Sequence, residues 1–459
     1  MRKNARFDSS ITVLGPPKIL SPIGAIPRNG DRYFVSDEER ILLNIDESEL
    51  AKARRGKTKP ITLERAGPRQ KIFFDPSKLR CAIVSCGGLC PGINDIIRAI
   101  VLTLHHNYGV PNIYGIRYGF EGFISSYGHE LIELTPDFVS SIHESGGTVL
   151  GTSRGHQDIG SIVDALERMN VGLLFTVGGD GTMVAATHIN KEIQKRNLKI
   201  SVIGIPKTID NDIYLIDRSF GFDTAVDMAV DVIRSAHNEA ISASNGIGLV
   251  KLMGRHSGFI AAAATLAMPD VNFCLIPECD FDLEGPSGLF ESLKHRLLKR
   301  RHSVIVCAEG AGQKFFTDQG SQRDASGNVR LGDIGLFLKE QINAYFQKID
   351  TQITLKYIDP SYTIRSVAAN ANDHILCGFL GRSAVHAGMA GKTTMLVGLC
   401  NNQLVHIPMA ATAGKRKHVD LTGDMWMSVL ETTGQPLLKK AVNRKPPVDP
   451  KKGGMGIEP

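Results

Sequence analysis

The chain has 459 residues, of which 42% are hydrophobic and 22% are charged, and its formal net charge is +6. This length suits two α/β lobes with an additional segment better than one small core. One Trp and 6% aromatic residues argue against a base-stacking surface. The basic runs at residues 52–59 and 439–452 are sparse for a nucleic-acid footprint. We therefore expect no nucleic-acid partner.

The eight cysteines show no spacing typical of a zinc site. Cys86 and Cys90 flank a glycine turn without a second pair, and others stand inside apolar runs, as reduced buried thiols do. The N-terminus has no continuous apolar signal segment, and no apolar run reaches the ~18 residues of a membrane span. These features predict a cytoplasmic protein without membrane association.

Along the chain, residues 1–79 carry short apolar runs broken by Pro and Gly. They predict an N-terminal extension with a few short strands or turns and a linker. From residue 80 the pattern becomes strand, glycine turn and helix, repeated. The expected strands cover residues 81–85, 171–177, 200–205, 248–252, 303–307 and 394–399. The expected helices cover residues 93–106, a segment beginning at 182, and residues 224–243, 258–268 and 335–348.

This alternation predicts an α/β fold in which mainly parallel sheets are flanked by helices. We place one lobe at residues 80–225 and a second at 226–425, with strands and helices able to cross between them. Residues 426–459 form a C-terminal segment with a basic tail. Ligands of such sheets bind beyond the carboxyl ends of the strands, which is where the polar loops of this sequence fall.

The first polar loop is a glycine-rich turn between an apolar strand and a helix, Gly178-Gly179-Asp180-Gly181-Thr182. Its bare backbone N–H groups can face phosphate oxygens. Such a turn can also serve only to let the strand and the helix pack closely. Asp180 favours the phosphate interpretation, because a carboxylate beside phosphates repels them unless Mg²⁺ bridges the two.

The most specific loop follows the next strand and reads Pro206-Lys207-Thr208-Ile209-Asp210-Asn211-Asp212. An Asp or Asn after a strand can simply cap a helix, but a cap needs one such residue and this loop offers several. Either Asp210 or Asp212 could deprotonate a sugar hydroxyl while its neighbour holds or orients a metal.

Other segments add positive charge or glycine but are weak signals by themselves. Met253-Gly254-Arg255 ends a third strand, residues 151–155 place Arg154 in a turn, and the turn at 87–92 contains Gly88. Lys356, Tyr362 and Arg365 lie in a strand-like stretch that suits a terminal phosphate, although an exposed strand would have the same composition. Residues 388–393 end like a Walker A loop, but two residues separate the glycines where that loop has four.

Taken together and in order, these motifs resemble those of 6-phosphofructokinase over roughly residues 79–423. The resemblance implies two similar α/β lobes with the active site in the cleft, the first lobe binding ATP and the second binding the sugar phosphate. It implies transfer of the terminal phosphoryl group of Mg·ATP to O1 of fructose 6-phosphate in glycolysis. It further implies an allosteric homodimer or homotetramer.

The resemblance assigns roles residue by residue. Asp210 would be the base on the 1-hydroxyl, supported by Thr208 and Asp212, and Asp180 would serve Mg²⁺. Donor phosphates would be held by Gly88, Arg154, Gly179, Asp180, Gly181, Thr182 and Lys207, with Arg154 bridging donor and acceptor. The sugar would be lined by Met253, Gly254, Arg255 and Glu309, and its 6-phosphate gripped by Lys356, Tyr362 and Arg365.

Two positions disagree about the donor. Gly181 is typical of ATP users, because a carboxylate there would intrude on the α-phosphate, whereas Lys207 resembles the pyrophosphate enzymes. The mixture is similar to the ATP-dependent enzymes of the pyrophosphate-like branch (the mixed-substrate "clade X" type), and the long extension agrees. We expect ATP, since a clash excludes a ligand and an extra Lys only adds attraction. Pyrophosphate stays the alternative.

Two departures from the bacterial type affect the sugar-phosphate contacts: no Arg stands near Gly246, and Tyr362 replaces a His. Among rival classes, NAD and lipid kinases share the loop at 178–182 but lack the loop at 206–212. A non-catalytic descendant would be marked by loss of Asp180 or Asp210, and both are present.

Overall fold

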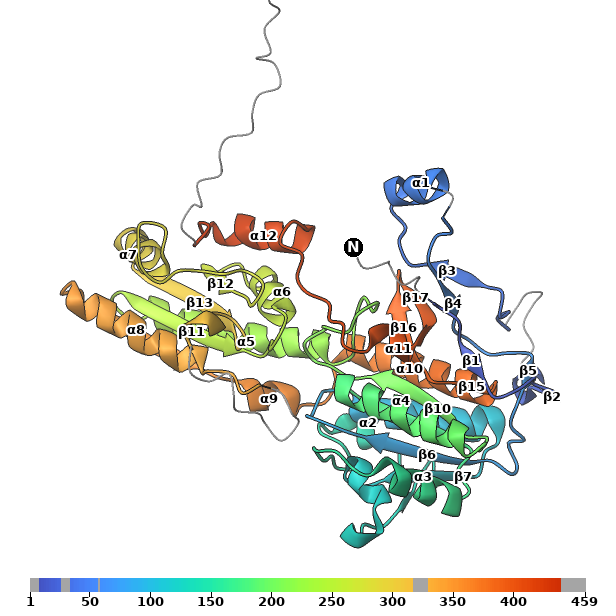
Figure 1. Cartoon of the computed structure of the whole chain (residues 1–459). Helices are drawn as coiled ribbons and strands as arrows, with labels where there is room; N and C mark the ends of the chain where they lie inside the picture. Colours follow the sequence, from blue (N-terminus) through green and yellow to red (C-terminus); the bar gives the residue numbers. More distant parts are fainter. Residues whose placement is uncertain (1–7, 26–33, 57, 317–328, 439–459) are drawn as a thin grey trace, which may run out of the picture.

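The computed structural model describes residues 8–25, 34–56, 58–316 and 329–438. These form two lobes side by side, with the N-terminal extension on the outer side of the first lobe (Figure 1). Within the described residues, the structure has no helix both long and apolar enough to cross a membrane.

The first lobe is built on a nine-stranded sheet whose central five strands are parallel. In spatial order the sheet runs β3 (Arg40–Leu42), β4 (Thr62–Arg65), β17 (Gln403–Pro408), β16 (Met395–Cys400), β10 (Ser201–Pro206), β9 (Leu173–Gly178), β6 (Arg80–Ser85), β7 (Asn112–Ile116) and β8 (Ile132–Glu133). The pairings of β3, β4, β17 and β8 are antiparallel. The central strands are almost wholly buried, as strands covered on both faces must be.

Helices cover both faces of this sheet, and a separate apolar cluster lies beneath each set. One face carries α2 (Ile93–Leu102) and α10 (Ala371–Met389), which pack on each other. The other face carries α3 (Ile159–Arg168) and α4 (Asp180–Lys195), with the short α11 (Met409–Thr412) beside α4.

The second lobe repeats the plan on a smaller, wholly parallel sheet. Its strands run in the order β12 (Phe273–Leu275), β13 (His302–Ala308), β11 (Gly246–Leu252) and β14 (Thr354–Ile358). Helices α5 (Phe222–Ile241), α6 (Phe259–Ala267) and α12 (Asp424–Thr433) share one apolar cluster, and α7 (Leu289–Arg300) and α8 (Ile334–Lys348) share another. The fold class predicted from the sequence is confirmed.

Short elements complete the described chain. They are the paired strands β1 (Thr12–Val13) with β15 (Lys392–Thr393) and β2 (Ile19–Leu20) with β5 (Lys71–Ile72), and helices α1 (Glu47–Arg55) and α9 (Ser361–Arg365). One-turn helices are η1 (Pro22–Ala25), η3 (Gly119–Phe123), η4 (Ser125–Tyr127), η5 (Ile142–Glu144) and η6 (Gln313–Phe315), and η2 (Thr103–Tyr108) is a π-helical end to α2.

The chain crosses between lobes more than once. The boundaries predicted from the sequence place the residues of α10, β16 and β17 in the second lobe. In the structure β16 and β17 belong to the first sheet, and α10 packs on one face of it. The physical reason is that β16 is apolar and buried along its length, so it needs a central position, and β10 supplies one beside it. The predicted boundary at residue 225 therefore separates the two lobes only up to residue 370, after which the chain returns to the first lobe.

Most expected elements occur with bounds shifted by a few residues, but the strand-like stretch at 356–365 is wrong in its second half. Residues 361–365 are helical (α9). Pro360 cannot donate to a strand ladder, and Asp359 Oδ1 accepts hydrogen bonds from the Ser361 N–H and hydroxyl at 3.1 and 2.5 Å. Strands β7, β8, β12 and β17 were not predicted, nor were helices α3, α7, α10 and α12.

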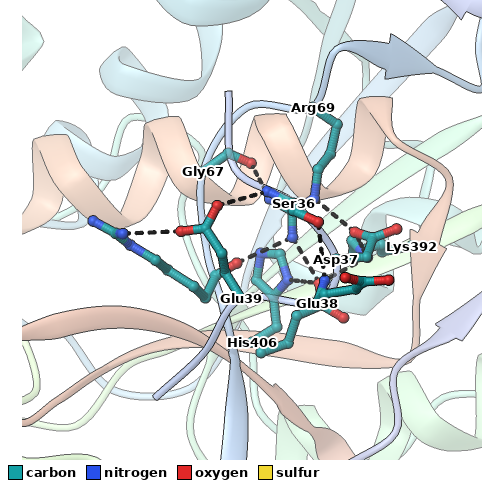
Figure 2. Close-up of polar contacts among 10 residues, drawn as sticks. Ser36, Asp37, Glu38, Glu39, Gly67, Arg69, Lys392 and His406 are labelled. Carbon is teal, nitrogen blue, oxygen red and sulfur yellow. Dashed lines mark hydrogen bonds and ion pairs between the residues drawn. The ribbon is translucent and has the colours of Figure 1, made fainter. Parts of the chain in front are cut away.

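A buried ionic cluster fastens the N-terminal extension to the first sheet (Figure 2). Glu64 Oε1 on β4 accepts hydrogen bonds from Arg69 Nη2 at 2.8 Å and His406 Nδ1 at 2.8 Å, and lies 2.7 Å from Lys392 Nζ. Asp37 Oδ1 adds contacts with Arg69 Nε at 2.7 Å and Lys392 Nζ at 2.9 Å. Burial by itself would raise the pKa of Glu64, but His406 and Lys392 outweigh it and lower this pKa to about 2.

We expect Lys392→Met to destabilise the protein by about 3 kcal/mol, because it leaves a buried carboxylate with one cation fewer. Urea and thermal unfolding at pH 7 measure this loss, and Lys191→Met on exposed α4 surface is the matched control. Because the pKa of Glu64 is depressed on folding, its contribution is present above about pH 4.5 and disappears as the pH falls toward 2. A loss no larger than in the control would show that the cluster does not stabilise the extension.

Candidate active site

The carboxyl ends of strands from both lobes meet at one place. In the first lobe Ser85, Gly178 and Pro206 end neighbouring strands, and in the second lobe Leu252 pairs with Ala308. The loop after β10 joins the two sets of strand ends. The Arg255 N–H donates to Asp210 Oδ2 at 3.3 Å, and the Ser257 hydroxyl donates to the Asp210 backbone oxygen at 3.1 Å.

The turns after β6 and β10 and the turn at 151–155 lie against one another. Lys207 is buried, and its Nζ donates to the Gly88 backbone oxygen at 2.7 Å. Burial lowers the pKa of this ammonium. A side chain at Gly88 would lie 3.7 Å from Arg154 Nη2, so the exposed Arg154 guanidinium stands over the turn. The structure thus brings Gly88, Arg154 and Lys207 together.

The three glycines of the turn after β9 have different structural roles. A Cβ at Gly178 would come within 2.2 Å of Thr182 Oγ1, so this glycine is required by packing. Gly179 caps α4, where its backbone oxygen accepts from the Thr182 N–H at 2.9 Å. Gly181 is exposed, and a Cβ there would meet no atom within 4 Å. The protein's own packing therefore does not require glycine at 181.

The loop after β10 does not cap a helix, because the next helix, α5, begins at Phe222 with Gly221 as its N-cap. Thr208 Oγ1 donates to Asp212 Oδ1 at 3.0 Å and accepts from the Asp210 N–H at 3.2 Å. The two carboxylates face different surroundings as a result. Asp212 is held by a hydroxyl and a guanidinium, whereas the Asp210 carboxylate accepts a hydrogen bond from the Arg255 backbone N–H.

These surroundings raise the pKa of Asp210 to about 7. Burial is the largest cause, followed by the negative charges of Asp212 and Glu309. Burial also raises the pKa of Asp180 and of Glu309. A carboxylate whose pKa lies near neutrality is suited to accept a proton in a reaction at pH 7.

Sequence reasoning missed one residue at the centre of this group. Arg416 Nη1 donates to Asp212 Oδ2 at 2.7 Å, and its Nη2 lies 3.2 Å from Asp180 Oδ2. The only local signal is the basic triplet Lys415-Arg416-Lys417, which looks like exposed surface. Spacing could not reveal contacts with loops some 200 residues earlier.

The second lobe contributes two loops packed backbone to backbone. Gly254 adopts φ +130°, and a Cβ there would lie 2.5 Å from the Ser257 oxygen, so glycine is required next to Met253 and Arg255. The Gly310 N–H donates to the Gly254 oxygen at 3.1 Å, and the Glu309 N–H to the Leu252 oxygen at 2.9 Å. Glu309 is therefore held beside Arg255, whose charge acts on it.

The predicted phosphate trio is only partly assembled. The Arg365 guanidinium lies 4.5 Å from the centre of the Tyr362 ring on α9, and its charge reaches Glu309. Tyr362 is 75% exposed. Lys356 is exposed on β14, where it pairs with Gly248 of β11, several residues before that strand ends.

Within the described ranges, the structure shows no group of three or more His, Cys, Asp or Glu side chains able to hold a metal ion. Mg²⁺ in nucleotide sites is commonly held by one or two carboxylates together with bound phosphates and water.

Comparison with known proteins agrees with this geometry. A family model described as "Phosphofructokinase" matches residues 80–388, and the chain belongs to the phosphofructokinase family. It is 49% identical to the ATP-dependent 6-phosphofructokinase of Borreliella burgdorferi, over 95% of this chain and 99% of that protein. It is 44% identical to the enzyme of the same name from Amycolatopsis methanolica, over 94% and 95% of the two chains.

Solved structures show the same fold. The pyrophosphate-dependent phosphofructokinase of Marinobacter aquaeolei matches with a TM-score of 0.62 at 20% identity, covering 78% of this chain and 91% of that one. At this identity the likeness concerns the fold alone. The family resemblance predicted from the sequence is confirmed.

Proposed function

We infer that this protein transfers the γ-phosphoryl group of ATP to O1 of fructose 6-phosphate, giving fructose 1,6-bisphosphate and ADP. The observation that carries this proposal is the Asp210 carboxyl, whose pKa is raised to about 7 where the strand-end loops of the two lobes meet. The names of the relatives from Borreliella and Amycolatopsis support the same activity.

On the donor side, the turn at Gly88 and the Gly179–Thr182 turn offer backbone N–H groups to phosphate oxygens, and Lys207 and Arg154 offer positive charge beside them. Asp180 would hold Mg²⁺, which fits a half-buried carboxylate at the start of a helix. When bound, the ion neutralises charge on the donor phosphates.

On the acceptor side, Asp210 takes the proton of the 1-hydroxyl as the oxygen attacks the phosphorus atom. Thr208 and Asp212 orient the loop that carries it. Met253, Gly254, Arg255 and Glu309 line the sugar, and Arg365 with Tyr362 and Lys356 binds the 6-phosphate. In this arrangement each lobe supplies the contacts of one substrate, and the Arg255 N–H and the Ser257 hydroxyl of the second lobe hold the loop that carries Asp210.

Pyrophosphate is the second candidate donor, because the buried Lys207 lies in the turn that would hold the phosphates. Glycine at 181 favours ATP, since the open space beside it admits a nucleotide's α-phosphate. We place the enzyme in the cytoplasm as a homodimer or homotetramer of the pyrophosphate-like branch.

The raised pKa of Asp210 predicts a pH dependence. The carboxylate is the active form, so kcat/KM should rise with pH and level off above about pH 7. Glu309→Gln removes a neighbouring negative charge that raises this pKa, and should therefore move the acid limb to lower pH. Asp210→Asn should lower kcat by about 10²–10⁴-fold at every pH. A variant Asp210→Asn with more than about a third of the wild-type kcat would exclude Asp210 as the base.

The donor is tested at position 181. Gly181→Asp should abolish most ATP turnover, because a carboxylate would face the α-phosphate in a partly desolvated site. Gly181→Ala is the matched control, since its Cβ meets no protein atom and adds no charge, and it should keep far more activity. Unchanged ATP kinetics in Gly181→Asp, or better wild-type turnover with pyrophosphate than with ATP, would contradict the assignment and favour Lys207 as the determinant.

The 6-phosphate contact is tested at Arg365. Arg365→Ala should raise KM for fructose 6-phosphate by about 10- to 150-fold, the range for a lost charge-assisted hydrogen bond, and leave KM for ATP nearly unchanged. Tyr362→Phe keeps the ring under the guanidinium and removes the hydroxyl, which separates ring stacking from phosphate contact. Equal effects of Arg365→Ala on both substrates would indicate general damage instead.

A further inference from the structure

Arg416 is held in the site by its own loop and not only by its side chain. Its backbone forms a bridge with Ile213, and the following Lys417 N–H donates to the Asp212 oxygen at 2.8 Å. Lys417 Nζ also donates to the Ile216 and Asp217 oxygens, each at 2.8 Å. The segment after α11 is thus fastened along the loop that carries Asp210.

The guanidinium of Arg416 bridges carboxylates from two different strand ends. It contacts Asp212 at 2.7 Å and Asp180 at 3.2 Å through separate nitrogens, and a third of its side chain is exposed. The Asp180 contact is the longer of the two. Asp180 is also the more exposed carboxylate, at 31% of its side chain against 7% for Asp212.

We propose that Arg416 is a positioning residue that competes with divalent cations for Asp180. It holds Asp180 and Asp212 together, so that a divalent cation would bind only weakly without nucleotide, and its contact with Asp180 is the one that would yield to Mg²⁺ bound with the donor. The proposal rests on the proposed function in taking Asp180 as the Mg²⁺ ligand.

The chemistry of the contacts explains why Arg416 would release Asp180 and keep Asp212. Two carboxylates brought together repel each other and attract a cation, and a guanidinium satisfies both with fixed fork geometry. A Mg²⁺ ion held by Asp180 would carry twice the charge of the guanidinium and would have donor phosphate oxygens as further ligands, so the longer contact of Arg416, to Asp180, is the one that would be lost. The shorter contact and the backbone links to the 212–217 loop keep Arg416 on Asp212 throughout.

The test measures metal binding without nucleotide or turnover. Mn²⁺ binding to the full-length protein, followed by electron paramagnetic resonance, should be weak in wild type and at least about 10-fold tighter in Arg416→Ala, where both carboxylates are open to the ion. Guanidinium ion added at millimolar concentration should weaken Mn²⁺ binding to Arg416→Ala toward the wild-type value.

Lys415→Ala is the matched control. It removes the same charge from the adjacent position, where the lysine lies 5.2 Å from the Tyr214 ring centre, and it should leave Mn²⁺ binding unchanged. Arg416→Lys keeps one charge that reaches one carboxylate at a time, and it should bind Mn²⁺ with intermediate affinity. Arg416→Lys also tests the proposal if Arg416→Ala does not fold.

Mn²⁺ affinity that is equal in wild type and Arg416→Lys, or a gain in Lys415→Ala as large as in Arg416→Ala, would overturn the role of Arg416. Failure of the proposed function looks different. In that case the wild type would not phosphorylate fructose 6-phosphate with either donor, whereas the metal-binding measurement would still report on the contacts of Arg416 with the two carboxylates.

Discussion

The structure depends on one buried carboxylate that joins the two lobes. Asp373, fully buried near the start of α10, accepts hydrogen bonds from the Gly221 N–H and the Thr224 N–H, each at 2.8 Å, and from the Thr224 hydroxyl. Those N–H groups lie at the N-terminus of α5 and have no partner within the helix. Because α5 leads into the second lobe and α10 returns to the first, this cap sets how the lobes meet.

Close backbone packing at the same joint explains its glycines. A Cβ at Gly221 would lie 2.3 Å from Cys90 Sγ, and one at Gly92 would lie 2.6 Å from Cys377 Sγ. Both glycines also adopt positive φ, at +85° and +96°. The starts of α2, α5 and α10 can therefore meet only with small residues at these points. The loop that carries Asp210 ends in this joint, so the position of the candidate base follows from the packing of the lobes.

Neighbouring acids of the site have different charged surroundings. Asp212 and Asp180 share Arg416, and Asp210 has burial and the negative charges of Asp212 and Glu309 around it. The guanidinium in contact with Asp212, against burial and like charges around Asp210, separates an anchoring acid from one that can exchange a proton. The same physics fastens the extension, where Glu64 stays charged because His406 and Lys392 lie beside it.

The sequence by itself determined what is local: the alternation of strand, glycine turn and helix, the family, and the loops at 178–182 and 206–212. These are short patterns that the order and spacing of residue types along the chain are enough to define. The tertiary structure alone decided that β16 and β17 complete the first sheet and that Arg416 lies between Asp180 and Asp212. Contacts across some two hundred residues leave no periodic or motif signal, because they are fixed by the packing of the lobes.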